Sequence, residues 1–206
     1  MNFSKYILVA ILLLPFQFAF AGYNQQGSDP YTQSVENMMA QALNTNKLEY
    51  DQRVNGTKDV PGFCQLIDTF TDVVTEVATR MNSVFSNATA DQQNRFEALV
   101  RSDFAYMILS AFDGIDKPSS LIVTLNKMVG DKAYVHIKSQ HGSVDLDVVM
   151  RDVINKGPAL IDVDLGSVSV VQVKVDDYTS TAAGDLNKLN DALEKHLVSN
   201  FGELCH

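Results

Sequence analysis

Residues 121–165 read LIVTLNKMVGDKAYVHIKSQHGSVDLDVVMRDVINKGPALIDVDL, and this stretch decides the fold because apolar and polar side chains alternate along it. A period of two is typical of strands that bury one face. Gly130-Asp131, His141-Gly142 and Lys156-Gly157-Pro158 supply short turns. We therefore expect four consecutive strands in an antiparallel meander with one buried and one polar face. The buried positions are Leu121, Val123, Leu125, Ala133, Val135, Ile137, Val144, Leu146, Val148, Met150, Ala159, Ile161, Val163 and Leu165.

Helical periodicity precedes this stretch. Asp29 is a suitable N-cap for a helix that starts at Pro30 and runs to about Leu43, and residues 44–61 are expected to be loop or short helix. Apolar residues keep a 3.6-residue period from 63 to 85, which predicts one long helix or two short ones. Thr89 and Gln92 form a capping box for a helix over 90–112, which Gly114 and Pro118 are expected to end.

The region after the meander contains two different signals. Val168, Val170, Val171, Val173 and Val175 are β-branched, so local propensity favours a strand. Leucines from Leu186 to Leu197 then predict a closing amphipathic helix. The whole order is typical of an α+β fold, in which helices pack on one face of a curved, mainly antiparallel four-stranded sheet.

The first residues predict export. Lys5 precedes an apolar run from Tyr6 to Leu14, and Ala19-Phe20-Ala21 suits signal-peptidase cleavage. We expect a signal peptide at 1–21, a flexible leader at 22–29, one domain at 30–202 and a tail at 203–206, located in the periplasm. No later segment approaches the roughly 18 apolar residues that a transmembrane helix needs, so stable membrane insertion is not expected.

Composition and motifs limit the function classes. A net charge of -9 would repel nucleic acid. Nucleotide-binding, nucleophile-elbow and zinc-ligand motifs are absent from the sequence, so we predict no metal, no cofactor and no enzymatic activity. Asp145, Asp147, Asp162 and Asp164 alternate with the apolar strand residues, and we expect all four on the solvated face. Cys64 and Cys205 can form one disulfide in an oxidising compartment, or Cys64 can be buried and Cys205 free.

Large apolar side chains, phenylalanine and methionine among them, occupy the helical stripes. Such residues ordinarily fill a core, but a helix layer on a curved sheet can also enclose an apolar cavity. If the cavity exists, we expect its walls to include residues of two helical segments and two strands: Phe70, Val74, Val77, Phe96, Val100, Phe104, Met107, Val135, Ile137, Val148 and Met150.

Four segments, in order, resemble the MlaC or toluene-tolerance family of periplasmic phospholipid-binding proteins. They are Asp29-Pro30, the stretch from Asn87 to Phe96, the stretch from Ile161 to Val170, and Gly184-Asp185-Leu186-Asn187-Lys188-Leu189 leading to Leu193. The chain departs from the family at Leu160-Ile161, where an aromatic residue is usual, and at Leu165, where an acid precedes the glycine.

In the family the segment after Gly-Val-Ser is a helix, so the resemblance implies a helix against the local strand propensity of Val168 to Val175. It also implies a cavity that takes phospholipid acyl chains, and transfer between an outer-membrane lipoprotein complex and the lipid-binding subunit of an inner-membrane ABC transporter. Three alternatives stay open: another apolar ligand such as a sterol-like lipid or an aromatic solvent, a solid-core interaction protein, and, least favoured, an enzyme.

Overall fold

A computed structural model describes residues 29–54, 61–112, 121–139, 145–201 and 204–205. The predicted signal peptide, most of the leader, Gly114 and Pro118 lie outside these residues. The sheet contains β1 (Leu121–Val129), β2 (Lys132–Ser139), β3 (Asp145–Val153), β4 (Gly157–Leu165) and β5 (Val168–Ser169), in that order. All neighbours are antiparallel, so the predicted meander is confirmed.

The expected number of four strands is wrong, because β5 adds a fifth. Gly166 and Ser167 have φ angles of 55° and 81°, and this left-handed pair turns the chain back on itself. Val168 and Ser169 then pair with Leu165 and Asp164. The turn depends on positive φ at Ser167 as well as at the glycine, and alternation of apolar residues does not reveal such a feature.

Burial alternates along β2, as a sheet with one covered face requires, but not in the centres of β3 and β4. Val148–Met150 and Ala159–Asp162 are buried without interruption. The register of β3 and β4 shifts at a bulge between Val149 and Met150, opposite Ile161. Helices also contact β4 from the side that carries Asp162, so the expectation of helices on one face only does not hold here.

The first helix, α2 (Pro30–Val54), starts as predicted. The carboxylate of Asp29 accepts hydrogen bonds from the backbone N–H groups of Tyr31 and Thr32 at 3.1 and 3.0 Å. The helix continues well past Leu43, where the sequence suggested a loop or a short helix. No glycine or proline lies between 44 and 54, so the backbone chemistry of this segment does not oppose a helix.

The apolar stripe from 63 to 85 forms α3 (Pro61–Phe70), α4 (Val73–Met81) and the short α5 (Ser83–Ser86). The break between α3 and α4 has a tertiary cause. Thr71 forms a parallel bridge with Leu160 of β4, and the N–H of Asp72 donates to the Leu160 carbonyl at 2.7 Å. Lys156 donates to the Thr71 carbonyl, also at 2.7 Å, so the chain is fixed to the sheet where the helix is interrupted.

Three longer helices complete the fold: α6 (Ala90–Phe112), α7 (Val170–Ala182) and α8 (Leu186–Phe201). The Thr89–Gln92 capping box is confirmed by reciprocal hydrogen bonds of 2.8 and 3.4 Å. Residues 170–182 are helical, as the family resemblance implied. The Ser169 hydroxyl caps α7 by accepting from the Gln172 N–H at 2.9 Å.

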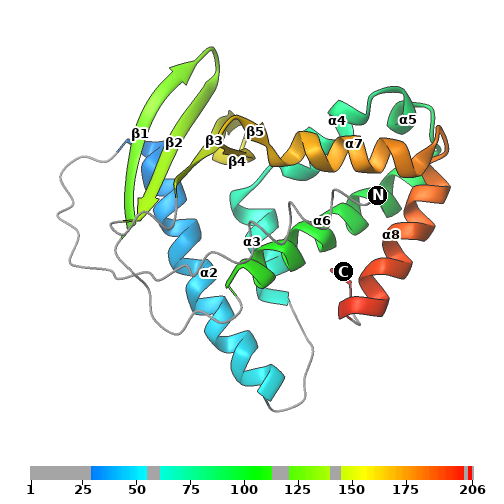
Figure 1. Cartoon of the computed structure of the whole chain (residues 1–206), viewed down its shortest axis with the longest axis horizontal. Helices are drawn as coiled ribbons and strands as arrows, with labels where there is room; N and C mark the ends of the chain where they lie inside the picture. The colour runs from blue at the N-terminus through cyan, green and yellow to red at the C-terminus, as the bar shows by residue number, and fades with distance from the viewer. Residues whose placement is uncertain (1–28, 55–60, 113–120, 140–144, 202–203, 206) are drawn as a thin grey trace.

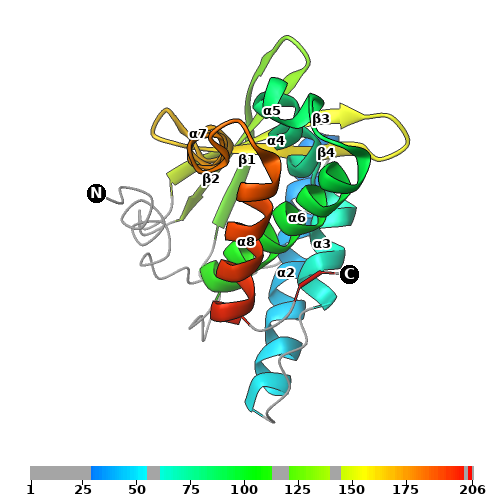
Figure 2. The same ribbon diagram turned by 90° about the vertical axis from the view of Figure 1, so that its right-hand side faces the viewer.

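Figures 1 and 2 show how these elements are arranged. Helices α2, α3 and α6 lie below the sheet, α7 runs beside α4 away from the β5 edge, and α8 lies below α7 and packs against α6 and α7. The β1–β2 hairpin extends at the opposite side in Figure 1. The helix layer therefore covers the sheet around β2, β3 and β4, and the space between the two layers is where a cavity can form.

Candidate ligand-binding cavity

An apolar cavity of about 170 Å³ lies between the helices and the sheet. Its walls come from five helices and three strands, and all lining residues except Thr71 and Asp162 are hydrophobic. They are Met38, Met39, Ala42, Leu66, Ile67, Thr71, Val73, Phe104, Met107, Ile108, Ile137, Leu146, Val148, Leu160, Asp162, Val163, Val170 and Val171.

Local periodicity directs these side chains inward. Phe104, Met107 and Ile108 recur at the three- and four-residue spacing of one helix face of α6. On the sheet, Ile137 pairs with Leu146 and Val148 pairs with Val163, so the side chains of each pair lie on the same face. The same side of the sheet thus supplies a continuous apolar surface opposite α6.

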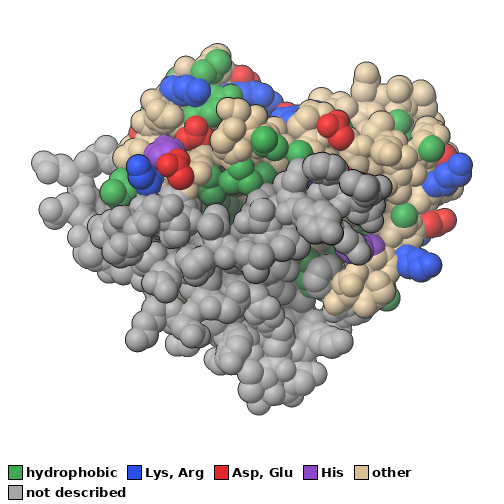
Figure 3. Space-filling model, viewed as in Figure 1, with side chains coloured by type: hydrophobic (Ala, Val, Ile, Leu, Met, Phe, Trp, Pro, Cys, Tyr) green, Lys and Arg blue, Asp and Glu red, His purple; other side chains and the backbone are tan. Residues whose placement is uncertain are grey.

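Several lining residues are partly exposed. They include Met38 and Met107 on the helices and Leu146 and Val163 on the sheet. On the face drawn in Figure 3, hydrophobic side chains gather between the β1–β2 hairpin and α7. Methionine is unbranched and flexible, so Met38 and Met107 are suited to a wall that adapts to its contents.

Four of the residues expected from the sequence line the cavity: Phe104, Met107, Ile137 and Val148. The other seven lie outside the lining. Phe70 and Val74 are partly exposed, and the remaining five are almost completely buried in the core: Val77, Phe96, Val100, Val135 and Met150. Phe96, for example, packs against the rings of Phe85 and Tyr178 at centroid distances of 5.8 and 6.1 Å.

Sequence reasoning missed the contribution of α2 and α7. Met38, Met39 and Ala42 lie at helical spacing on the predicted helix that starts at Pro30, but the expected cavity wall did not include them. Val170 and Val171 enter the wall only because β5 turns the chain back toward β4. The helical spacing of Met38, Met39 and Ala42 was a usable signal for the cavity wall. The position of α7 depends on the turn before β5, which the alternation of apolar residues did not predict.

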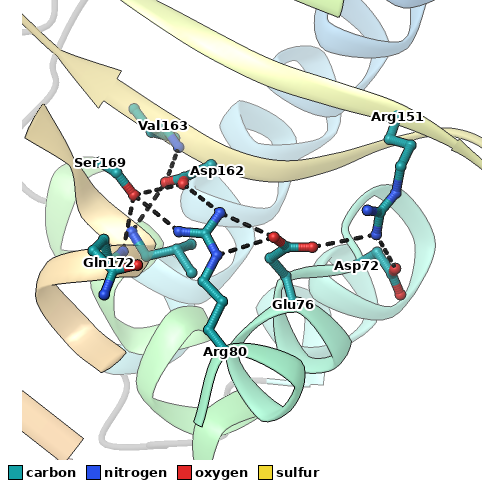
Figure 4. Close-up of polar contacts among 9 residues, drawn as sticks. Asp72, Glu76, Arg80, Arg151, Asp162, Val163, Ser169 and Gln172 are labelled. Atoms are coloured by element: carbon teal, nitrogen blue, oxygen red, sulfur yellow. Dashed lines mark hydrogen bonds and ion pairs between the residues drawn. The ribbon is translucent and has the colours of Figure 1, made fainter. Parts of the chain in front are cut away.

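Asp162 contributes to the cavity wall and is also the centre of a polar network (Figure 4). Its exposure is 4%, so its expected place on the solvated face is wrong. One carboxylate oxygen accepts from Arg80 at 3.0 Å and from the Ser169 hydroxyl at 2.6 Å, and the other accepts from the backbone N–H groups of Val163 and Val171 at 2.8 and 3.0 Å. Arg80 and Val171 thereby join α4 and α7 to β4, and Ser169 joins β5 to it.

The network continues from Arg80 along α4. The Glu76 carboxylate forms an ion pair with Arg80 at 3.0 Å and a second one with Arg151 of β3 at 3.3 Å. Arg151 also lies 3.6 Å from the Asp72 carboxylate. The other polar lining residue, Thr71, donates its hydroxyl hydrogen to the Ile67 carbonyl at 2.8 Å. Both polar lining residues, Asp162 and Thr71, are therefore engaged in hydrogen bonds within the protein. The cavity interior offers a ligand hydrophobic contact rather than hydrogen bonds.

The other three aspartates of the meander lie on the exposed or partly exposed face, as expected. Asp147 is the register partner of Asp164, and the Nδ1 atom of His136 lies 3.0 Å from Asp147. Partial burial, followed by the nearby charges of Asp162 and Asp147, raises the pKa of Asp164. Within the described ranges, no group of three or more His, Cys, Asp or Glu residues is placed to hold a metal ion.

A second buried polar cluster lies on the α6 and α7 side of the core. Asp103 pairs with Lys174 at 2.6 Å and accepts a hydrogen bond from the Tyr178 hydroxyl. Burial, then the charge of Asp103 and the hydrogen bond to it, raises the pKa of Tyr178 well above its usual value. This cluster fixes α7 to α6 and is not part of the cavity lining.

A disulfide joins Cys64 and Cys205, whose Cα atoms are 5.6 Å apart. Next to it, the backbone N–H of Cys205 donates to the buried Ser102 hydroxyl at 2.9 Å. The end of the chain is thereby attached to α3 and α6, two of the helices that form the cavity wall.

Comparisons with protein-family models and with curated protein sequences give no match for this chain. A similar solved structure is the phospholipid-binding protein from Ralstonia solanacearum, determined in complex with a phospholipid. It has 14% sequence identity and a TM-score of 0.61, with 83% of this chain and 98% of that chain covered. At this identity the likeness demonstrates a shared α+β fold.

No helix in the described part of this chain has the length and hydrophobicity to cross a membrane.

Proposed function

We propose that this protein is a non-enzymatic periplasmic carrier that shields lipid acyl chains from water. The observation that carries the proposal is an apolar cavity between the helices and the sheet, in a fold shared with a protein crystallised with a phospholipid. Transfer of apolar surface out of water is worth about 0.8 kcal/mol per methylene. A cavity with hydrophobic walls can therefore hold an acyl chain without directional polar contacts.

The cavity volume bears on how lipid enters. An engineered cavity of about 150 Å³ binds benzene, so 170 Å³ accommodates only part of a diacyl lipid. Binding of whole acyl chains therefore requires the cavity walls to move apart. The partly exposed Met38 and Met107 are flexible side chains of those walls that can change rotamer. The head group would remain near solvent.

The resemblance to the MlaC family supports the remaining parts of the proposal. In this interpretation the chain is a divergent member that carries phospholipid between an outer-membrane lipoprotein complex and the lipid-binding subunit of an inner-membrane ABC transporter. Burial in the carrier and burial in a bilayer offer similar free energies per methylene, so the direction of transfer must come from those partners.

Lipid extraction and native mass spectrometry of the full chain, purified from a bacterial periplasm, test the proposal. We expect co-purified phospholipid. Val163→Trp, which enlarges a partly exposed lining residue, should lower the bound lipid, while Val74→Trp at a partly exposed position outside the lining should not. A wild-type protein that yields only the unliganded mass and no extractable lipid would contradict the proposal.

A small aromatic molecule is the second candidate ligand, and the cavity volume favours it. If it is the natural ligand, benzene or toluene should raise the melting temperature of the protein, and Val163→Trp should abolish the increase. The phospholipid proposal predicts instead that the extracted material contains diacyl lipid.

A further inference from the structure

The edge strand β1 exposes an apolar surface that the cavity does not explain. Seven large apolar side chains are exposed in the described part of the chain, and four of them lie on β1: Ile122, Leu125, Met128 and Val129. Their register partners show that they occupy both faces, since Ile122 and Val129 lie opposite Lys138 and Lys132, and Leu125 and Met128 lie opposite Val135 and Ala133. The strand is therefore apolar on either side of its free edge.

The same hairpin is basic in an acidic protein. Residues 121–139 contain three lysines and one aspartate, a net charge of +2, whereas the chain carries -9. The Lys127 ammonium lies 4.7 Å from the centre of the Tyr134 ring, and Lys132 is the register partner of Arg151 in β3. Positive charge thus accompanies the exposed apolar side chains along β1 and at the hairpin turn.

The backbone of β1 is a poor template for another strand. Its pairing with β2 shifts between Leu125 and Lys127, which places a bulge at Asn126 in the middle of the edge. Bulges and lysines on edge strands oppose pairing with a further chain. An occupant that contacts side chains, without requiring a regular hydrogen-bond ladder, fits this edge better than an added protein strand.

We propose that the β1–β2 hairpin is a contact site for the surface of an anionic lipid bilayer. Met128 and Val129 would enter the boundary between head groups and acyl chains, and Lys127 and Lys132 would extend to the lipid phosphates. The acidic remainder of the chain is repelled by such a surface, so the charge distribution orients the molecule with the hairpin toward it. This inference does not depend on what the cavity holds.

The absence of tryptophan from the sequence provides a clean test. Met128→Trp places a single reporter on the hairpin, and Val198→Trp places one at an equally exposed site, 47% in both cases, on α8. With vesicles of phosphatidylglycerol and phosphatidylcholine at low salt, we expect a blue-shifted emission for Met128→Trp and none for Val198→Trp. The emission should return to its original wavelength when the vesicles are removed, which separates surface contact from lipid taken into the cavity.

Vesicle sedimentation of the otherwise unchanged chain gives the second measurement. Met128→Ser with Val129→Ser should reduce binding at least about tenfold, and Lys127→Gln with Lys132→Gln should reduce it about fivefold per lysine. Val198→Ser and Lys195→Gln, on α8, should leave it unchanged. Circular dichroism checks that each variant is folded.

Equal binding to vesicles of pure phosphatidylcholine, or no effect of the hairpin substitutions, would overturn the proposal. It is also overturned if the Met128→Trp emission shifts with protein concentration in the absence of vesicles, because a second copy of the chain would then cover the strand.

Discussion

Asp162 is held by four hydrogen-bond donors that come from α4, β4, β5 and α7. Its side chain and that of Arg80 retain only 5% and 21% of their exposure. Asp162→Ala would leave Arg80 with Glu76 and the Ser169 hydroxyl, and would remove the carboxylate that accepts from the N–H groups of Val163 and Val171. Removal of one partner from a buried ion pair costs about 3 to 5 kcal/mol, so we expect a loss of this size in the free energy of unfolding measured with urea.

The exposed pair of Arg95 and Asp191 provides the control for that substitution. Its side chains keep 40% and 71% of their exposure, and exposed ion pairs contribute about 0 to 1 kcal/mol. Asp191→Ala should therefore change stability little. An Asp162→Ala protein with the stability of Asp191→Ala would show that the network around Asp162 does not hold α4 and α7 to the sheet.

The hydroxyl of Tyr178 gives a pH-dependent prediction. Its pKa is raised in the folded state by burial and by Asp103, whereas an unfolded tyrosine has a pKa of about 10. Above pH 10 the unfolded chain loses this proton while the folded chain keeps it, so stability declines as the pH rises, by up to about 1.4 kcal/mol per pH unit. Tyr178→Phe should flatten the decline of unfolding free energy between pH 10 and 11, and an unchanged slope would contradict this assignment.

At the scale of elements, the parts that follow from local chemistry could be predicted and those that need a distant partner could not. Asp29 and the Thr89–Gln92 pair cap their helices through hydrogen bonds to neighbouring residues. The break at Thr71 instead requires Leu160, some ninety residues later in the chain. The buried Asp162 of β4 requires Arg80 from α4, and the alternation of apolar and polar residues by itself predicts a solvent-exposed side chain there.

The cavity lining likewise contains residues that local periodicity predicts and residues that depend on distant parts of the chain. The periodicity of Phe104, Met107, Ile137 and Val148 points these side chains toward the space between helices and sheet, and they line the cavity there. Phe96 and Val100 have the same periodicity but lie nearer the N-terminal end of α6, where other side chains fill the core. Periodicity gives the direction of a side chain, whereas the position of the cavity along a helix depends on how α2, α3 and α7 close around it.

The Cys64–Cys205 disulfide joins two elements that are 141 residues apart in sequence. A cross-link of this span lowers the conformational entropy of the unfolded chain, worth about 4 to 5 kcal/mol in the chain-entropy model. We expect the double substitution Cys64→Ser and Cys205→Ser to lower the free energy of unfolding by most of that amount. Wild-type protein treated with a reducing agent should match the double variant in urea unfolding, and full stability after reduction would exclude this role.

The proposed function requires that the space between the helix layer and the sheet is available to a ligand. Ala42 and Ala105 form a matched pair for a test of this requirement, because both are buried on helices, with 2% and 1% exposure, but only Ala42 lines the cavity. Ala42→Leu adds methyl groups to free space and should change the melting temperature little or raise it. Ala105→Leu forces the same groups into filled core, which costs about 1 to 3 kcal/mol.

The two variants should also differ in ligand content. If the cavity takes acyl chains, Ala42→Leu occupies part of their volume and should reduce the lipid that co-purifies with the protein, while Ala105→Leu that remains folded should keep it. Equal destabilisation by both substitutions, with unchanged lipid, would mean that the region around Ala42 is packed as tightly as the rest of the core. The comparison therefore tests the hollow interior separately from the identity of its ligand, because stability is measured on protein from which lipid has been extracted.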